Sequence, residues 1–293
     1  ILKKRLKKIK IYPGFKKIEK KLKVKADYTM SAISGIEGLR PTISIIKKSK
    51  RIAIANKESL ICGWGLIQKE LKKHKTEFIP VDSEHFSIWS VIKDYQKSDI
   101  EKIILTASGG PFLNKKIKKN TTARDAISHP NWSMGKKISI DSATLMNKIF
   151  EIIEAKKIFN IELNKFEILI HPKSYIHAIV KFKNGLIKII AHDTDMKIPI
   201  SNSIYMGDNK QNFLKSKKID LNILNSLNLQ KVRIKKFPVF KILNKITKQE
   251  TLFDTVLVSI NDELVSLFLE NKIKFLDISS KICHLINSPL FQN

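Results

Sequence analysis

Short apolar segments alternate with helix-forming segments in the first part of the chain, and this alternation constrains the fold more than any other feature. Residues 51–55 and 78–81 are short apolar runs of the kind that form buried parallel strands. Residues 33–46 are expected to be helical, and Ser59 is expected to cap a second helix that runs to about Lys73. Strands and helices in this order build half of a doubly wound sheet.

A second group of apolar segments follows in the middle of the chain. A strand is predicted at 103–106, a helix at 147–159, and three strands of a second sheet after that helix. The C-terminal part has helical periodicity with few turn signals. We therefore predict an α/β fold with a small C-terminal helical domain. The predicted division is 1–80, 81–205, 206–231 as a connection, and 232–293 as the helical domain; the three strands are predicted at 166–170, 176–182 and 186–191.

Composition narrows the possible classes of protein. The 293 residues are 43% hydrophobic, so the chain can bury a substantial core. No apolar run approaches the roughly 18 to 20 residues that span a bilayer, and the basic residues 1–10 are not followed by the hydrophobic core of a signal peptide. The two cysteines, Cys62 and Cys283, are far apart and indicate neither a disulfide framework nor a thiolate metal site. These features predict a cytoplasmic protein.

The net charge of +28 is the one feature that favours nucleic-acid binding. Lysine is spread over nearly every segment instead of forming a patch, and it accompanies heavy use of Ile and Asn. Such a pattern is expected from a drift toward A- and T-rich codons, so nucleic-acid binding is the least favoured function. A positive field of this size would still attract a doubly charged phosphate ester.

Two carboxylates follow the apolar run at 78–81. Asp82 and Glu84 are separated by one residue, so an extended backbone would direct both side chains to the same side. Crowded carboxylates raise one another's pKa, and a cation relieves that cost. Two solvated acids in a turn remain the simpler interpretation of an isolated pair.

A third carboxylate occurs on the predicted helix at 147–159. Asn147 and Lys148 lie four and three residues before Glu151, so the three side chains share one helix face. An exposed ion pair worth about 0.2 to 0.5 kcal/mol would look the same. The functional interpretation is that Glu151 is a metal ligand while Asn147 and Lys148 hold substrate oxygens. Hard oxygen ligands of this kind suit Mg²⁺ or Mn²⁺.

Two further segments have the composition of a phosphate-binding turn and of a mobile loop. Ser108 ends an apolar strand and precedes two glycines, where a hydroxyl and backbone N–H groups can meet a phosphate. His129 precedes Pro130, which favours an extended backbone, and with Trp132 it would close over a bound ligand. A structural histidine and an ordinary turn are the alternatives.

In their order along the chain, these segments resemble 1-deoxy-D-xylulose 5-phosphate reductoisomerases, from about residue 26 to residue 280. The long block from His129 to Lys148 is the most specific part of the likeness. The matching stretches are Ala55-Asn-Lys-Glu-Ser-Leu60, Pro80-Val-Asp-Ser-Glu-His85, Ser108-Gly-Gly-Pro-Phe112, residues 129–144, Met146-Asn-Lys148, Glu151, Ile170-His-Pro172 and Asp195-Met-Lys-Ile-Pro-Ile200.

The resemblance implies a reaction and a role for each matching residue. The family converts 1-deoxy-D-xylulose 5-phosphate to 2-C-methyl-D-erythritol 4-phosphate, using NADPH and a divalent metal ion that acts as a Lewis acid. The implied metal ligands are Asp82, Glu84 and Glu151, and the implied catalytic residues are Glu84, Lys148 and Glu151. The implied substrate-binding residues are Lys57, Ser83, Glu84, Ser108, His129, Ser142, Asn147, Lys148 and Glu151, and the implied cofactor-binding residues are Asn56, Glu58 and Gly135.

The sequence also departs from the family. Family members open with a strand, a glycine-rich turn and a helix that seat the NADPH pyrophosphate, and no such segment precedes residue 26, so residues 1–80 are expected to form part of that domain. Ile149 and Phe150 follow Asn147-Lys148, where the family usually has a glycine, and a bulky side chain there is expected to crowd the helix start. A remnant that binds metal and phosphate without redox activity is therefore the alternative function. The resemblance also implies a homodimer.

Overall fold

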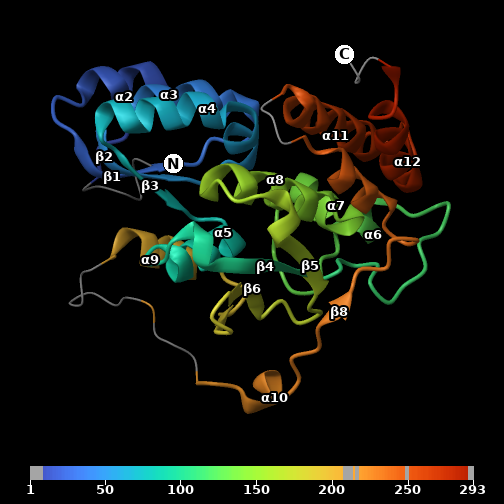
Figure 1. Cartoon of the computed structure of the whole chain (residues 1–293). Coiled ribbons are helices and arrows are strands. Elements are labelled where there is room, and N and C mark those ends of the chain that lie inside the picture. Colours follow the sequence, from blue (N-terminus) through green and yellow to red (C-terminus); the bar gives the residue numbers. More distant parts are fainter. Residues whose placement is uncertain (1–8, 207–213, 215–217, 248–250, 290–293) are drawn as a thin grey trace. The chain divides into compact units, whose positions relative to one another are not determined.

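The computed structural model describes residues 9–206, 214, 218–247 and 251–289. The chain divides into two compact units, Ile1–Pro80 and Val81–Asn293. Both combine helices with β-sheet, which confirms the predicted α/β class (Figure 1). The basic residues 1–8 and much of the predicted connection, 207–213 and 215–217, lie outside the described residues. Among the described helices, none is long and apolar enough to cross a membrane.

The first unit is built on a three-stranded parallel sheet in the order β1-β2-β3. The central strand has three consecutive residues, Ile52 to Ile54, that are almost completely buried. Burial of successive residues on both faces of the sheet explains why this strand is an uninterrupted apolar run in the sequence. Figure 1 shows the helices on one side of the sheet. The strands are β1 (Ala26–Ser31), β2 (Ser49–Ile54) and β3 (Glu77–Pro80); the helices are α2 (Phe15–Lys21), the 3₁₀ helix η1 (Ile36–Gly38), α3 (Leu39–Ile46) and α4 (Lys57–His74).

The residue that caps helix α4 is Asn56, and the prediction of Ser59 as the cap is wrong. The backbone of Asn56 is extended, and its side-chain oxygen accepts a hydrogen bond from the backbone N–H of Ser59 at 2.6 Å. Asparagine is as good an N-cap as serine. Because Asn56 follows the end of β2 so closely, the helix begins earlier than expected and Ser59 lies in its first turn.

The second unit contains a five-stranded mixed sheet in the order β7-β6-β4-β5-β8. Its central strand β4 pairs parallel with β5 and antiparallel with β6, and the outer pairs are antiparallel. The strands predicted at 166–170 and 176–182 are present with those bounds, and a further short strand, β8, pairs with β5. The strands are β4 (Ile100–Ala107), β5 (Phe166–Ile170), β6 (Ile176–Phe182), β7 (Ile187–Ala191) and β8 (Gln230–Lys231).

Helices α5 and α8 carry most of the candidate site. Helix α5 packs on β6 and β7, and α8 packs against α5, α7 and β4. A single residue, Leu145, in the left-handed backbone region (φ 65°) separates α7 from α8 and turns the chain between them. The helices are α5 (Ser83–Ile92), α6 (Ala123–Ile127), α7 (Lys136–Thr144), α8 (Met146–Phe159), α9 (Lys197–Ile204), α10 (Leu221–Leu224), α11 (Phe253–Leu269) and α12 (Phe275–Leu285); the 3₁₀ helices are η2 (Lys97–Asp99), η3 (Leu163–Lys165) and η4 (Pro238–Lys245).

The two bulky residues at the start of α8 belong to the core of the second unit. Ile149 is 0% exposed and Phe150 is 1% exposed. Both residues keep helical geometry within α8, since no break in that helix accompanies them. Their side chains therefore add buried apolar surface, which stabilises the helix that carries Glu151.

Truncation of Ile149 to alanine is expected to destabilise the second unit. Removal of a fully buried isoleucine side chain leaves a cavity and costs about 2 to 5 kcal/mol of unfolding free energy. The matched control is Leu276→Ala on α12, because Leu276 is 42% exposed and its truncation should cost much less. Urea unfolding of the three proteins measures both values. A stabilising Ile149→Ala would show that the side chain crowds the helix.

Candidate metal and substrate site

Asp82 and Glu84 lie at the N-terminus of helix α5, and the predicted extended backbone through this pair is wrong. Asp82 is the N-cap, and its Oδ1 accepts a hydrogen bond from the backbone N–H of Glu84 at 3.3 Å. Glu84 is in the first helical turn. Negative side chains are favoured there because the helix dipole is positive at its N-terminus. The two carboxylates are therefore brought together by the start of a helix, and not by the extended backbone that was predicted.

Glu151 joins this pair from helix α8. Oxygen atoms of Asp82, Glu84 and Glu151 all lie within 4.8 Å of one another, and Glu151 is buried. Three carboxylates at this spacing offer the hard oxygen donors that Mg²⁺ and Mn²⁺ prefer. The donor set thus fits a divalent cation, and the structure brings together the three residues that the sequence indicated.

The ammonium group of Lys148 compensates part of this negative charge. Its Nζ lies 2.7 Å from Glu84 Oε1 and contacts Glu151 Oε2, and both the lysine and Glu151 side chains are nearly inaccessible to solvent. Burial alone lowers the pKa of Lys148, but the charges of Glu151 and Glu84 outweigh burial and raise it above the ordinary value. Lys148 is therefore a permanent cation at the centre of the cluster.

Two neutral side chains orient the carboxylates. Asn147 Nδ2 donates a hydrogen bond to Glu151 Oε1, and Ser83 Oγ donates one to Glu84 Oε2. Both residues were predicted to bind substrate. In the structure each already holds a carboxylate of the cluster, which fixes the direction of the candidate ligand atoms.

Ser108 and His129 are joined by a hydrogen bond within the second unit. Backbone N–H groups of Asn131 and Trp132 donate to His129 Nδ1, at 3.2 and 2.9 Å, so a neutral ring carries its hydrogen on Nε2. Nε2 then donates to Ser108 Oγ at 2.9 Å, and the Gly110 N–H donates to the same oxygen at 3.0 Å. Because Ser108 Oγ accepts both hydrogen bonds, its own hydrogen can be donated to a phosphate oxygen.

Gly110 allows this turn to approach helix α7. Its φ is +64°, and a Cβ at this position would lie 2.8 Å from the backbone oxygen of Ser142. A larger residue is therefore excluded by backbone conformation and by space. The close approach places the Ser108 turn beside Ser142, another predicted substrate-binding residue.

The remaining predicted site residues fall into two places. Asn56, Lys57 and Glu58 belong to the first unit, at the end of β2 and the start of α4, and Gly135 is the N-cap of α7 in the second unit. An added Cβ at Gly135 would meet no atom within 4 Å. The carboxylate cluster itself is formed by residues of the second unit.

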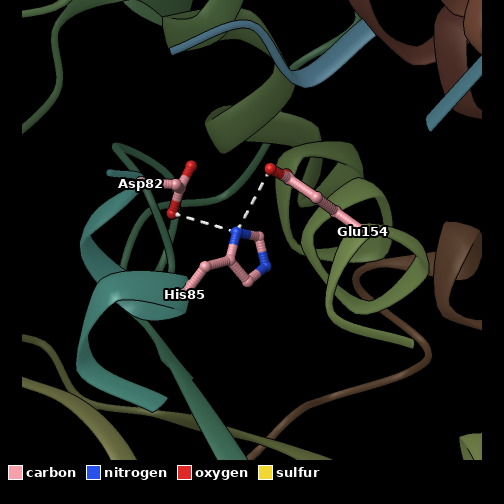
Figure 2. Close-up of side chains that lie close together, drawn as sticks. All are labelled: Asp82, His85 and Glu154. Carbon is pink, nitrogen blue, oxygen red and sulfur yellow. Dashed lines mark ion pairs between the residues drawn. The ribbon is translucent and has the colours of Figure 1, made fainter. Parts of the chain in front are cut away.

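Two further pairs of residues were not expected from the sequence. His177 on β6 stacks on His192, with ring centroids 3.7 Å apart, and makes a T-shaped contact with Trp132. His85 lies between Asp82 and Glu154, as Figure 2 shows. The position of Glu154, three residues after Glu151 on the same helix face, was the available signal.

Three clustered carboxylates, a buried lysine and a hydroxyl-bearing turn on an α/β scaffold are typical of enzymes that use a divalent cation. Models of one protein family match three parts of the chain. The model described as 1-deoxy-D-xylulose 5-phosphate reductoisomerase matches residues 1–64, its C-terminal domain matches 78–159, and a DXP reductoisomerase C-terminal domain matches 192–292.

Individual relatives agree with the family models. The chain is 59% identical over 288 residues to the 1-deoxy-D-xylulose 5-phosphate reductoisomerase of Pelagibacter ubique, covering 97% of this chain and 74% of that protein. It is 41% identical to that of Sulfurihydrogenibium sp., covering 92% of this chain and 71% of the relative. The chain therefore belongs to the 1-deoxy-D-xylulose 5-phosphate reductoisomerase family.

Solved structures give the same result for the fold. The Zymomonas mobilis enzyme in complex with NADPH superposes with a TM-score of 0.83 at 35% identity, over 94% of this chain and 71% of that one. A DOX-P reductoisomerase in complex with NADPH, fosmidomycin and magnesium gives 0.85 at 33% identity, over 95% and 71%. The same fold is thus shared along nearly the whole chain.

Acidification is expected to destabilise the second unit. Burial lowers the pKa values of His129 and His177 to about 4 from 6.5. Between these values the unfolded chain binds more protons than the folded one, so this contribution to stability is full above pH 6.5 and is lost as the pH falls toward 4. The fall in Tm from pH 7 to pH 5 should be smaller in a His129→Asn, His177→Asn double variant than in wild type. Equal falls in Tm would show that the lowered pKa values of His129 and His177 do not cause the loss of stability.

Proposed function

We propose that this chain carries out the NADPH- and divalent-metal-dependent rearrangement and reduction of 1-deoxy-D-xylulose 5-phosphate to 2-C-methyl-D-erythritol 4-phosphate. The observation that carries the proposal is the cluster of Asp82, Glu84 and Glu151 around Lys148 in a member of this family. A relative of the same fold has been solved with NADPH, fosmidomycin and magnesium, which supports the same set of ligands here.

Asp82, Glu84 and Glu151 would hold Mg²⁺ or Mn²⁺, which when bound supplies Lewis-acid polarisation of the ketose oxygens. Lys148 has a fixed positive charge beside two of these carboxylates, so it limits their mutual repulsion and offers N–H donors to negatively charged substrate oxygens. Asn147 and Ser83 hold the carboxylates in one orientation. The chain thus presents a preorganised site whose donors need little rearrangement.

The phosphate group of the substrate is assigned to the Ser108 turn and to Ser142. Ser108 receives hydrogen bonds from His129 and Gly110, which leaves its hydroxyl hydrogen for a phosphate oxygen. The lowered pKa of His129 keeps its ring neutral near pH 7, so the histidine acts there as a hydrogen-bond donor and not as a cation. Residues 129–135 contain no helix or strand, which suits a segment that excludes water from the site.

NADPH is assigned to the first unit. Ligands bind at the carboxyl ends of parallel strands, and Asn56, Lys57 and Glu58 follow the carboxyl end of β2 directly. The N-terminus of helix α4 there has the positive end of the helix dipole, which suits an anionic cofactor. Asn56 and Glu58 are assigned to the cofactor.

Replacement of Glu151 by glutamine is expected to remove most turnover. The amide is a poor ligand for Mg²⁺ or Mn²⁺, and since loss of even a neighbouring support residue costs about 10 to 100-fold, loss of a ligand should cost at least about 100-fold in kcat. The measurement is NADPH oxidation that depends on 1-deoxy-D-xylulose 5-phosphate and Mn²⁺. The exposed residue Glu162 provides the matched control, Glu162→Gln, with unchanged turnover.

The same assay, together with thermal unfolding, distinguishes the proposed enzyme from a binding remnant without redox activity. Unchanged activity in Glu151→Gln would refute the metal assignment. If the wild type oxidises no NADPH while Mn²⁺ and the phosphorylated substrate still raise its Tm, the chain is a binding remnant without redox activity.

We also propose that the chain forms a homodimer through strand β7. Strand β7 is at the edge of the sheet in the second unit, and Leu186, Ile187 and Ile189 are 45%, 54% and 49% exposed. An edge strand with an apolar exposed face is expected to be covered by another chain. A second copy of the same chain is the partner that the family resemblance implies.

A double variant, Ile187→Lys with Ile189→Lys, is expected to convert the dimer to a monomer. Both side chains are exposed, so charge there opposes association while the fold tolerates it. Light scattering coupled to size exclusion measures the mass, and thermal unfolding checks the fold. The control is Ile234→Lys, which changes an isoleucine that is 52% exposed outside β7 and should leave the mass unchanged. A dimeric double variant would exclude β7 as the interface.

We place the protein in the cytoplasm. In support, Cys62 and Cys283 form no disulfide, which fits a reducing compartment. The positive charge is consistent with attraction of a phosphorylated substrate, without any need for nucleic acid.

A further inference from the structure

A buried imidazole joins the two helices that carry the carboxylate cluster. His85 is in the first turn of α5, directly after Glu84, and its side chain is 0% exposed. Glu154 is on α8, three residues after Glu151, and its side chain is 3% exposed. Figure 2 shows the ring of His85 between the carboxylates of Asp82 and Glu154.

The contact of His85 with the α8 backbone determines which ring nitrogen carries hydrogen. Nε2 lies 2.8 Å from the backbone oxygen of Glu151. A carbonyl oxygen can only accept, so Nε2 must donate. The ring is thereby attached to the residue whose side chain is the third carboxylate of the cluster.

The opposite nitrogen of the ring faces two carboxylates. His85 Nδ1 lies 3.3 Å from Glu154 Oε1 and 3.8 Å from Asp82 Oδ1, and these contacts are favourable when Nδ1 also carries a hydrogen and the ring is a cation. Asp82 Oδ1 also accepts the N–H of Glu84. One ring therefore contacts a carboxylate oxygen of one candidate metal ligand and the backbone of another, and Glu154 is the buried group that holds the ring from α8.

We propose that Glu154 is a positioning residue, which acts through His85 to fix Asp82 and Glu151 at the separation that a divalent cation requires. This inference rests on the proposed function, because it assigns Asp82 and Glu151 as metal ligands. Glu154 does not itself touch substrate or cofactor in this scheme. Its carboxylate fixes the ring, and the ring fixes the spacing between the start of α5 and the middle of α8.

A second metal ion between Asp82, His85 and Glu154 is the competing interpretation, because these three groups also have ligand atoms within 4.8 Å of one another. A protonated ring at this position pairs with both carboxylates, since Nδ1 is within ion-pair distance of each. The positioning role accounts for all three residues without a second ion, and the number of ions bound per chain decides between the two.

The test is a titration of the whole chain with Mn²⁺ alone. The electron paramagnetic resonance signal of unbound Mn²⁺ reports how much is bound. Glu154→Leu has a similar size but no acceptor, and its Kd for Mn²⁺ should rise by about 10 to 100-fold, as expected for loss of a residue that orients a metal ligand. Glu154→Gln keeps an acceptor oxygen and should restore most of the affinity. In the turnover assay, Glu154→Leu should raise the half-saturating Mn²⁺ concentration, with kcat largely recovered at saturating Mn²⁺.

Asp254→Asn is the matched control. Asp254 is a buried carboxylate that pairs with Lys157 of the same helix α8 at 2.8 Å, and its replacement should affect Tm without changing Mn²⁺ affinity. If Glu154→Leu does not fold, Glu154→Asp, which draws the carboxylate back from the ring, is expected to weaken Mn²⁺ binding in the same way.

Two results would overturn the positioning role: unchanged Mn²⁺ affinity in a folded Glu154→Leu protein, or two Mn²⁺ ions per wild-type chain. Because the binding measurement contains neither substrate nor NADPH, it is independent of the reaction. A wild-type chain that binds one Mn²⁺ with Glu154-dependent affinity but oxidises no NADPH would refute the proposed function and leave this inference standing.

Discussion

The contact of Lys148 with Glu84 and Glu151 is the interaction on which the arrangement of the second unit's site depends. Carboxylates buried close together repel one another, and a helix pair that brought them together without a cation would lose stability. Lys148 compensates that repulsion from within the site, and the same carboxylates keep the lysine protonated despite its burial. Packing of α5 against α8 and the charge of this lysine therefore support each other, because displacement of α5 would separate Glu84 from the buried lysine.

One face of helix α8 carries the third carboxylate of the cluster together with the residues that support it. Asn147, Lys148, Glu151 and Glu154 recur at spacings of three and four, so they form one stripe. Ile149 and Phe150 of the same helix are buried in the core, and their packing holds the helix in place. The left-handed backbone of Leu145, between α7 and α8, costs roughly 1 to 3 kcal/mol of local strain, which the surrounding packing must offset. Strain of this kind is found where backbone direction is fixed by the site.

Much of the fold follows from local sequence, because strands that are buried on both faces, such as β2, are unbroken apolar runs. Local rules failed where two of them competed. Asn56 and Ser59 are both good caps, and only the turn after β2 decides between them. Asp82 and Glu84 suggest an extended pair, yet Asp82 is a helix cap. His85 and Glu154 were missed for another reason: they are far apart in sequence, and nothing in either segment alone shows that the packing of α5 on α8 brings them into contact.

Residue spacing alone did not connect Asp82 and Glu84 with Glu151. The family resemblance did, because it implied that all three residues bind one metal ion. The resemblance assigns a metal, substrate or cofactor to each residue, but it does not show which contacts hold that residue in position. The contacts show that several residues assigned to substrate, such as Asn147 and Ser83, also hold carboxylates in the structure. A substitution at either position would thus alter metal affinity as well as substrate affinity. Apparent substrate-binding residues in a charged site of this kind are best separated from positioning residues by measuring metal binding without substrate.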